Sequence, residues 1–111
     1  QREWFNKIYL VDKKNFIFII YYKNEKIGCI GFRISENAWD IYNVMNISSN
    51  FKGVGIMHTS LKELIKFIKM KKNLDFKAKV LNSNQNLNWY LKNNFKVIDK
   101  NIDYTNIKYF G

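Results

Sequence analysis

The fold is decided by residues 38–68, which read AWDIYNVMNISSNFKGVGIMHTSLKELIKFI. Residues 38–47 predict a strand, because aromatic and β-branched side chains recur along them. Residues 48–55 form a polar segment that holds two glycines. From residue 54 onward, apolar side chains recur at the spacing of one helix face, and they are Val54, Met57, Leu61, Leu64, Ile65 and Ile68. The stretch therefore predicts a strand, a loop and a long helix in succession.

Upstream of this stretch, the sequence predicts a helix and a β-hairpin. Residues 2–10 place aromatic and apolar side chains at helical spacing, which indicates the end of an amphipathic helix. Two runs rich in β-branched and aromatic residues follow, 16–23 and 27–34, and the polar residues 24–26 between them are typical of a turn. The hairpin therefore leads directly into the strand at 38–47.

Downstream of the long helix, four more elements are expected. They are a strand at 76–81, a short helix at 87–92, and two closing strands at 95–99 and 104–110. The strand, helix and strand within 38–81 imply one parallel pair with a right-handed crossover. The predicted fold class is therefore α/β, a mixed sheet with helices on its faces.

The composition indicates one domain over residues 1–111 that is held together by packing. A chain of this length with 47% hydrophobic residues can bury a single core. Cys29 is the only cysteine, so no disulfide forms within the chain and a cytoplasmic compartment is expected. One histidine and one cysteine cannot form a typical zinc site, so no metal is expected. The longest apolar run, residues 16–22, is far shorter than the roughly 20 residues of a membrane span, so no membrane partner is expected.

The net charge of +10 comes almost entirely from lysine. Of the 19 basic residues, only Arg2 and Arg33 are arginine. Arginine is the residue favoured for bidentate contacts with phosphates and base edges. The charge therefore indicates a surface that attracts anions in general, and a dedicated nucleic-acid-binding module is the less favoured interpretation.

Residues 50–55, Asn-Phe-Lys-Gly-Val-Gly, are the segment most suggestive of chemistry. Glycines at the start of a helix let an anion approach the free N–H groups and the positive end of the helix dipole. Ile56-Met57 stands where a Walker motif has its Lys and Ser or Thr, and the dinucleotide-binding pattern lacks its third glycine. The segment predicts a phosphate cradle, while a plain helix start with flexible glycines stays open.

The same segment resembles the acyl-CoA loop of the GNAT acetyltransferases, a Gln/Arg-x-x-Gly-x-Gly/Ala motif in which Asn50 here replaces the first residue. Upstream, residues 27–32 (IGCIGF) are similar to the second strand of the family's hairpin, and Trp4-Phe5 is similar to the helix before it. Downstream, the family has in order a strand, an Asn-containing turn, a Tyr-bearing helix and a closing Gly-Phe. The residues of this chain in those places are Val80, Asn84, Tyr90 and Asn94-Phe95. The likeness covers nearly the whole chain.

Two departures from the family pattern lie in this last part. Asn94 stands where the family has glycine, and Asn84 lies one residue closer to Tyr90 than usual. Asparagine also adopts the left-handed conformation that ends a helix. The resemblance implies a GNAT-like fold that is N-terminally truncated, because a full member begins with a further strand and helix of roughly 30 to 50 residues.

The resemblance also implies acetyl-CoA as co-substrate, with no metal. In this family the fourth and fifth strands splay apart, and the pantetheine arm bonds the exposed strand edge, which here is Val44, Met45, Asn46 and Ile47. The pyrophosphate is then expected on the main-chain N–H groups of Lys52, Gly53, Val54, Gly55 and Ile56. Asn84 is a further candidate contact.

Acetyl transfer to a primary amine needs a base, a donor to the oxyanion and a proton for the departing thiolate. Tyr90 is the candidate acid, because family members use the tyrosine at this place in that role. A strand N–H near Met45 is the candidate oxyanion donor, and Asp40 or a water chain is the candidate base. It stays open whether Asp40 simply faces solvent and whether Tyr90 only packs on the sheet.

Three short segments point to one subfamily: the Lys-Gly-Val-Gly loop, Trp4-Phe5, and residues 90–95 (YLKNNF) resemble the nucleotide-amino-sugar N-acetyltransferases of the pseudaminic acid pathway. The favoured function is an acetyl-CoA-dependent N-acetyltransferase that acts on a nucleotide-linked amino sugar. A protein or peptide amine is the alternative acceptor. A non-catalytic basic module that binds RNA or another anion, and a relative that binds CoA without turnover, are the alternative functions. A homodimer stays open.

Overall fold

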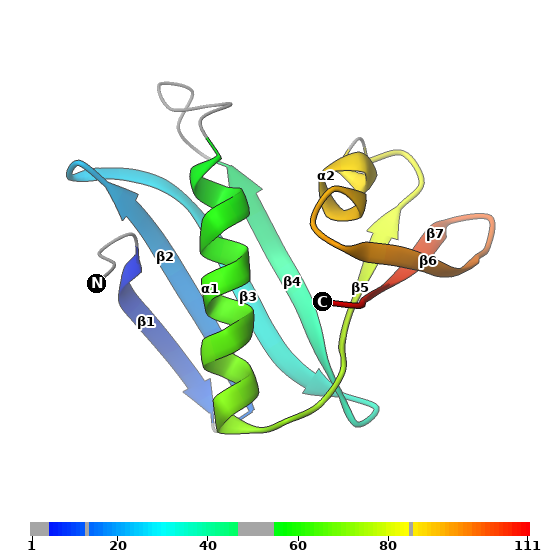
Figure 1. Ribbon diagram of the computed structural model, residues 1–111, viewed down its shortest axis with the longest axis horizontal. Coiled ribbons are helices and arrows are strands. Elements are labelled where there is room, and N and C mark those ends of the chain that lie inside the picture. Colours follow the sequence, from blue (N-terminus) through cyan, green and yellow to red (C-terminus); the bar gives the residue numbers. More distant parts are fainter. Residues whose placement is uncertain (1–4, 13, 47–54, 85) are drawn as a thin grey trace.

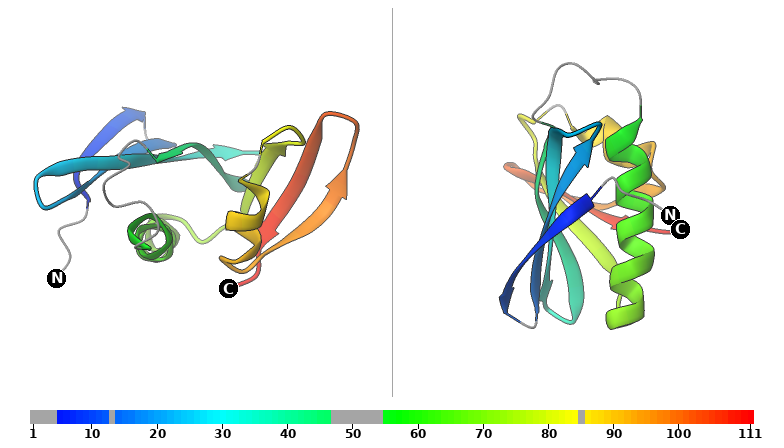
Figure 2. Two further views of the ribbon diagram at one scale, coloured as in Figure 1. Left: turned by 90° about the horizontal axis from the view of Figure 1, so that it is seen from above. Right: turned by 90° about the vertical axis from the view of Figure 1, so that its left-hand side faces the viewer.

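One mixed sheet with two helices on the same side forms the architecture (Figures 1 and 2). The computed structural model describes the backbone of residues 5–12 and the whole of residues 14–46, 55–84 and 86–111. Seven strands are ordered β1-β2-β3-β4-β5-β7-β6. The elements are β1 (Phe5–Asp12), β2 (Asn15–Tyr22), β3 (Glu25–Ser35), β4 (Ala38–Asn46), α1 (Ile56–Lys71), β5 (Phe76–Leu81), α2 (Leu87–Leu91), β6 (Phe95–Lys100) and β7 (Tyr104–Tyr109). Neither helix within these ranges is long and apolar enough to cross a membrane.

The elements predicted from residue 16 onward are confirmed within a few residues at their ends. The parallel strand pair expected within residues 38–81 is formed by β4 and β5. Asn94 follows α2 with φ of 69°, the left-handed conformation for which asparagine substitutes for glycine. Most of the glycine-bearing loop, residues 48–54, lies outside the described residues.

The helix predicted over residues 2–10 is wrong, because residues 5–12 form strand β1. It pairs antiparallel with β2, from Phe5 opposite Ile20 to Asp12 opposite Asn15. The segment FNKIYLVD combines helical spacing with aromatic and β-branched residues, and spacing alone does not separate the two structures in so short a run. Pairing with β1 satisfies backbone groups of β2 that would otherwise lie on an open edge, and this contact decides in favour of the strand.

The core lies between α1 and one face of the sheet. Five predicted residues of the apolar helix face are buried, namely Met57, Leu61, Leu64, Ile65 and Ile68, while Val54 lies outside the described residues. They face the buried side chains of Phe18, Phe32 and Trp39 from three neighbouring strands. The indole Nε1 of Trp39 donates a hydrogen bond to the carbonyl of Lys72 at 2.9 Å, which ties the end of α1 to β4.

Strands β4 and β5 part after a short parallel ladder. Only three residue pairs join them in the described chain, from Trp39–Phe76 to Ile41–Ala78. Beyond Ile41, β4 pairs with β3 alone, while β5 pairs along its other edge with β7 up to Leu81. The sheet therefore opens into two arms beyond this point, as Figure 1 shows.

A β-bulge lies in the free part of β4. Gly31 pairs with Tyr42 and Cys29 pairs with Met45, so β3 has one residue between these pairs and β4 has two. Asn43 in the bulge has φ of 55°, and its carbonyl accepts a hydrogen bond from the Cys29 thiol at 3.1 Å. Cys29 is thus a buried free thiol that contacts the bulge.

Candidate active site

A cleft of about 920 Å³ opens where β4 and β5 part. Both strands line it, together with the turn before α2, α2 itself and the β6–β7 hairpin. Two of its lining side chains, Asp40 and Tyr90, are those that the sequence analysis singled out as base and acid. The fold therefore brings both candidates to one cavity, although their catalytic roles stay predictions.

Tyr90 reaches the cleft from α2 and is only 6% exposed. Its ring packs edge-on against Trp89 and Phe95, with centroids 5.1 and 5.3 Å apart. Burial, and after it the negative charge of Asp40, raise the pKa of Tyr90 well above its usual value near 10. The phenol therefore keeps its proton at neutral pH, and the residue both packs and faces the cleft.

Asp40 enters the cleft from β4 on the face of the sheet opposite α1. Its neighbours Trp39 and Ile41 are buried in the core, so the alternation of a strand turns Asp40 to the other face. Its Oδ2 atom accepts a hydrogen bond from Nε of Arg33 at 2.9 Å, and its side chain is 24% exposed. Asp40 is therefore a partly buried, paired carboxylate.

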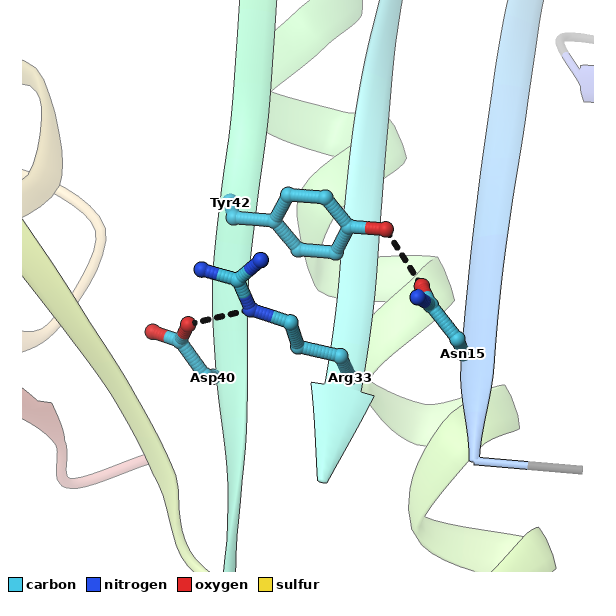
Figure 3. A network of polar contacts seen from close by, with 4 residues as sticks. All are labelled: Asn15, Arg33, Asp40 and Tyr42. Carbon is cyan, nitrogen blue, oxygen red and sulfur yellow. Dashed lines mark hydrogen bonds and ion pairs between the residues drawn. The ribbon is translucent and has the colours of Figure 1, made fainter. Parts of the chain in front are cut away.

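Arg33 belongs to a network that crosses three strands on this face (Figure 3). Its guanidinium lies over the ring of Tyr42, 4.2 Å from Cζ to the ring centroid. The Tyr42 hydroxyl donates a hydrogen bond to Oδ1 of Asn15 on β2. Arg33 and Tyr42 thus connect the carboxylate of Asp40 on β4 to Asn15 on β2, the strand next to β3 on its other edge.

The predicted pantetheine-binding edge is the part of β4 beyond its ladder with β5. Val44 and Met45 line the cleft there, and Asn46 ends the strand. Ile47 lies outside the described residues. Because these residues have no backbone partner on β5, the edge of β4 is available to a ligand with peptide-like groups.

The start of α1 has the features that a phosphate cradle needs, as far as it is described. Gly55 has φ of 79°, is the N-cap residue and provides no side-chain cap to the helix. A Cβ atom placed on Gly55 would have no neighbour within 4 Å, so its surroundings are open. Ile56 begins the helix, while Lys52, Gly53 and Val54 lie outside the described residues.

Asn84 lines the cleft, but its side-chain oxygen is already engaged. Its Oδ1 accepts a hydrogen bond from the backbone N–H of Asn86 at 2.8 Å, at the start of α2. This bond helps to set the position of the helix that carries Tyr90. Its side-chain amide nitrogen has no hydrogen-bond partner among the described residues, and its contact with a cofactor stays a prediction.

Comparisons with known proteins match this architecture. No protein-family model and no curated protein matches the sequence. Among solved structures, the PaiA N-acetyltransferase of Thermoplasma acidophilum in complex with coenzyme A has a TM-score of 0.76 and 22% identity, over 88% of this chain and 62% of that chain. The chain has the GNAT acetyltransferase fold.

Two further structures share this GNAT fold. The Campylobacter jejuni N-acetyltransferase PseH in complex with acetyl coenzyme A has a TM-score of 0.71 and 27% identity, over 87% of this chain and 68% of that chain. A GNAT family acetyltransferase from Elizabethkingia anophelis with acetyl-CoA bound has a TM-score of 0.67 and 23% identity, over 86% of this chain and 73% of that chain. The predicted GNAT-like fold class is thereby confirmed.

Within the GNAT fold, the sequence analysis did not predict the contacts of three residues at the cleft or behind it: Arg33, Tyr42 and Asn15. For the contact between Arg33 and Asp40, the turn between the two strands is a possible signal. Glu36-Asn37 joins β3 to β4 as a two-residue turn, and both residues have positive φ. Such a turn sets the register that places Arg33 opposite Asp40. The contacts of Tyr42 with Arg33 and Asn15 depend on how three strands lie together, which the hairpin register does not determine.

Proposed function

We propose that this protein is an acetyl-CoA-dependent N-acetyltransferase. The observation that carries the proposal is the parting of β4 from β5, which opens a cleft lined by Asp40 from one strand and Tyr90 from α2. The GNAT fold supports the same conclusion, since coenzyme A or acetyl-CoA is bound in three of its solved examples. A neutral phenol and a carboxylate that face one cavity can supply the acid and the base for acyl transfer to an amine.

The residues present fit acetyl-CoA as co-substrate. The free edge of β4 at Val44 and Met45 offers backbone donors and acceptors to the amide groups of the pantetheine arm. The open N-terminus of α1 at Gly55 and Ile56 offers main-chain N–H groups and the positive end of the helix dipole to the diphosphate. Lys52, Gly53 and Val54 are proposed to complete this cradle.

In the proposed reaction, Asp40 accepts a proton from the acceptor ammonium, directly or through water. The neutral amine attacks the thioester carbonyl, and a backbone N–H near Met45 donates to the oxyanion. Collapse of the tetrahedral intermediate breaks the C–S bond, and Tyr90 donates its proton to the CoA thiolate. The second proton of the attacking nitrogen passes through water to the Tyr90 phenolate, which restores the phenol and leaves the amide, and Asp40 returns its proton to solvent. Since the charge of Asp40 helps to raise the pKa of Tyr90, protonation of Asp40 makes the phenol a stronger acid when the thiolate leaves.

We propose a nucleotide-linked amino sugar as the acceptor, with a protein or peptide amine as the alternative. The Lys-Gly-Val-Gly loop and the segment 90–95 support the first choice through their resemblance to amino-sugar N-acetyltransferases. The 27% identity to the N-acetyltransferase PseH across 87% of the chain supports acetyl transfer to an amine nitrogen.

The test has two stages. Acetyl-CoA at about 100 times its Kd should stabilise the folded state by about 2.7 kcal/mol, seen as a rise in Tm, while oligonucleotides should not. Release of CoA thiol is then measured across a panel of primary amines, with nucleotide-linked amino sugars beside lysine peptides. Stabilisation without thiol release from any amine would indicate a CoA-binding protein without turnover. Stabilisation by oligonucleotides alone, with a steep salt dependence, would indicate the nucleic-acid module.

A further inference from the structure

We infer that Arg33, stacked on Tyr42, is a positioning residue that orients the Asp40 carboxylate and keeps one of its oxygens free for the reaction. The inference rests on the proposed function, in which Asp40 is the base. It assigns a role to three residues that the proposed reaction does not itself use, namely Arg33, Tyr42 and Asn15 on the sheet face opposite α1 (Figure 3).

The first step of the argument is the geometry of the Asp40 carboxylate. Arg33 and Asp40 are direct partners across β3 and β4, next to the turn at Glu36-Asn37. Nε of Arg33 donates to Oδ2 at 2.9 Å, and Oδ1 has no hydrogen-bond partner among the described residues. One oxygen is therefore held while the other stays available, which is the arrangement that a positioned general base needs.

The second step is what holds Arg33 itself. Its guanidinium lies 4.2 Å from the centroid of the Tyr42 ring, so the side chain is held by stacking as well as by the carboxylate. Tyr42 is held in turn by the hydrogen bond from its hydroxyl to Asn15. The ring extends from β4 across β3 to reach β2, as Figure 3 shows.

The third step is that Gly31 on β3 leaves space for this ring. A Cβ atom at position 31 would lie 2.9 Å from Cε1 of Tyr42 and 3.0 Å from its carbonyl oxygen. A side chain at position 31 would therefore force the ring to shift. The network therefore depends on a glycine in the middle of a strand, where glycine otherwise weakens the sheet.

The fourth step is the choice of residue. Nearly all of the positive charge of the chain comes from lysine, and Arg33 is the only arginine among the residues that the structure describes. A lysine would supply the same charge, but it cannot offer a planar group that stacks on a ring while Nε donates to a carboxylate. An ion pair this exposed contributes little to stability, because the arginine side chain is 49% exposed and well solvated. Orientation of Asp40 explains the arginine better than stability does.

The test is a double-mutant cycle on kcat, using acetyl-CoA and the amine that gives turnover. Arg33→Ala should lower kcat by roughly tenfold to a hundredfold, with the KM for acetyl-CoA little changed, because a displaced base slows the chemical step. Arg33→Lys should not restore kcat. In the Asp40→Asn background, Arg33→Ala should cost almost nothing further, since a residue that acts through Asp40 has nothing left to position. Lys96→Ala removes another exposed cation that lies over an aromatic ring, that of Phe110, and should leave kcat unchanged.

Three results would overturn the inference. They are an equal loss of kcat with and without Asp40, full rescue by Arg33→Lys, or an effect of Arg33→Ala on KM alone. Crystal structures of the protein and of Arg33→Ala provide a test that needs no turnover: the Asp40 side chain should change its rotamer, and an unchanged Asp40 would contradict the inference. Absence of thiol release by the unmodified protein would instead count against the proposed function, so the two failures are distinguishable.

Discussion

The two faces of the central strands are built in different ways. Under α1, Phe18, Phe32 and Leu61 are fully buried and meet through apolar contacts. On the opposite face, Arg33 and Asp40 are partly open to solvent and are held by a hydrogen bond and ring stacking. Apolar burial stabilises the fold, whereas the polar contacts mainly set the direction of side chains. Stability and catalysis should therefore be separable by substitutions on the two faces.

The largest effect is expected on the α1 face. Phe32→Ala should lower the free energy of unfolding by about 3–5 kcal/mol, because a fully buried ring in contact with Phe18 and Phe76 leaves a cavity. Urea denaturation measures the change. Ile102→Ala is the matched control, since that side chain is 92% exposed and should change stability by less than about 0.5 kcal/mol. A comparable loss at both positions would remove the contrast between core and surface.

Next in size is the loss of the proposed acid. Tyr90→Phe should lower kcat by about 100-fold, because the thiolate then leaves without a proton from the protein. Stability should change little, since the hydroxyl has no hydrogen-bond partner among the described residues while the ring remains. Tyr109→Phe is the control, because that ring also packs on Phe95, at 5.3 Å between centroids. Unchanged kcat in Tyr90→Phe, with thiol release intact, would remove Tyr90 from the mechanism.

A smaller effect is expected from crowding the ring of Tyr42. Gly31→Ala places a methyl group against that ring. Because the displaced ring no longer holds Arg33, and Arg33 then no longer orients Asp40, kcat should fall roughly tenfold. Steady-state kinetics and a melting curve together separate this loss from unfolding. Lys26→Ala, an exposed position on the same strand, should behave like the unmodified protein. If kcat stayed normal in Gly31→Ala, the ring position would not matter for the reaction.

The smallest effect concerns alkaline pH. Because the folded-state pKa of Tyr90 is raised, the phenol ionises in the unfolded chain near pH 10 but stays neutral in the folded one. This difference in pKa therefore leaves the free energy of unfolding unchanged below about pH 10. Above that pH it lowers the free energy of unfolding, by about 1 kcal/mol near pH 11. Denaturation at pH 8 to 11 should show this loss in the unmodified protein and not in Tyr90→Phe. Asp40→Asn should reduce it, since the charge of Asp40 helps to raise that pKa.

Much of the fold could be predicted because it depends on local patterns. The apolar face of α1, the limits of β5 and the left-handed Asn94 all follow from residues close together in the chain. The segment 5–12 could not be assigned by the same means, because its spacing suits a helix and its residue types suit a strand. Pairing with β2 decided the outcome, and that contact is a property of the folded sheet.

The candidate site likewise combines features that follow from the sequence with features that follow from the tertiary structure. By itself, the sequence determined the order of the elements from residue 16 onward and the residue types at Asp40 and Tyr90. Only the tertiary structure decided that β4 leaves β5 after three pairs, that Asp40 and Tyr90 face one cleft, and that Tyr42 supports Arg33. The physical reason is that local periodicity sets the direction of side chains within an element. The divergence of two strands depends instead on distant partners, here β3 along β4 and β7 along β5.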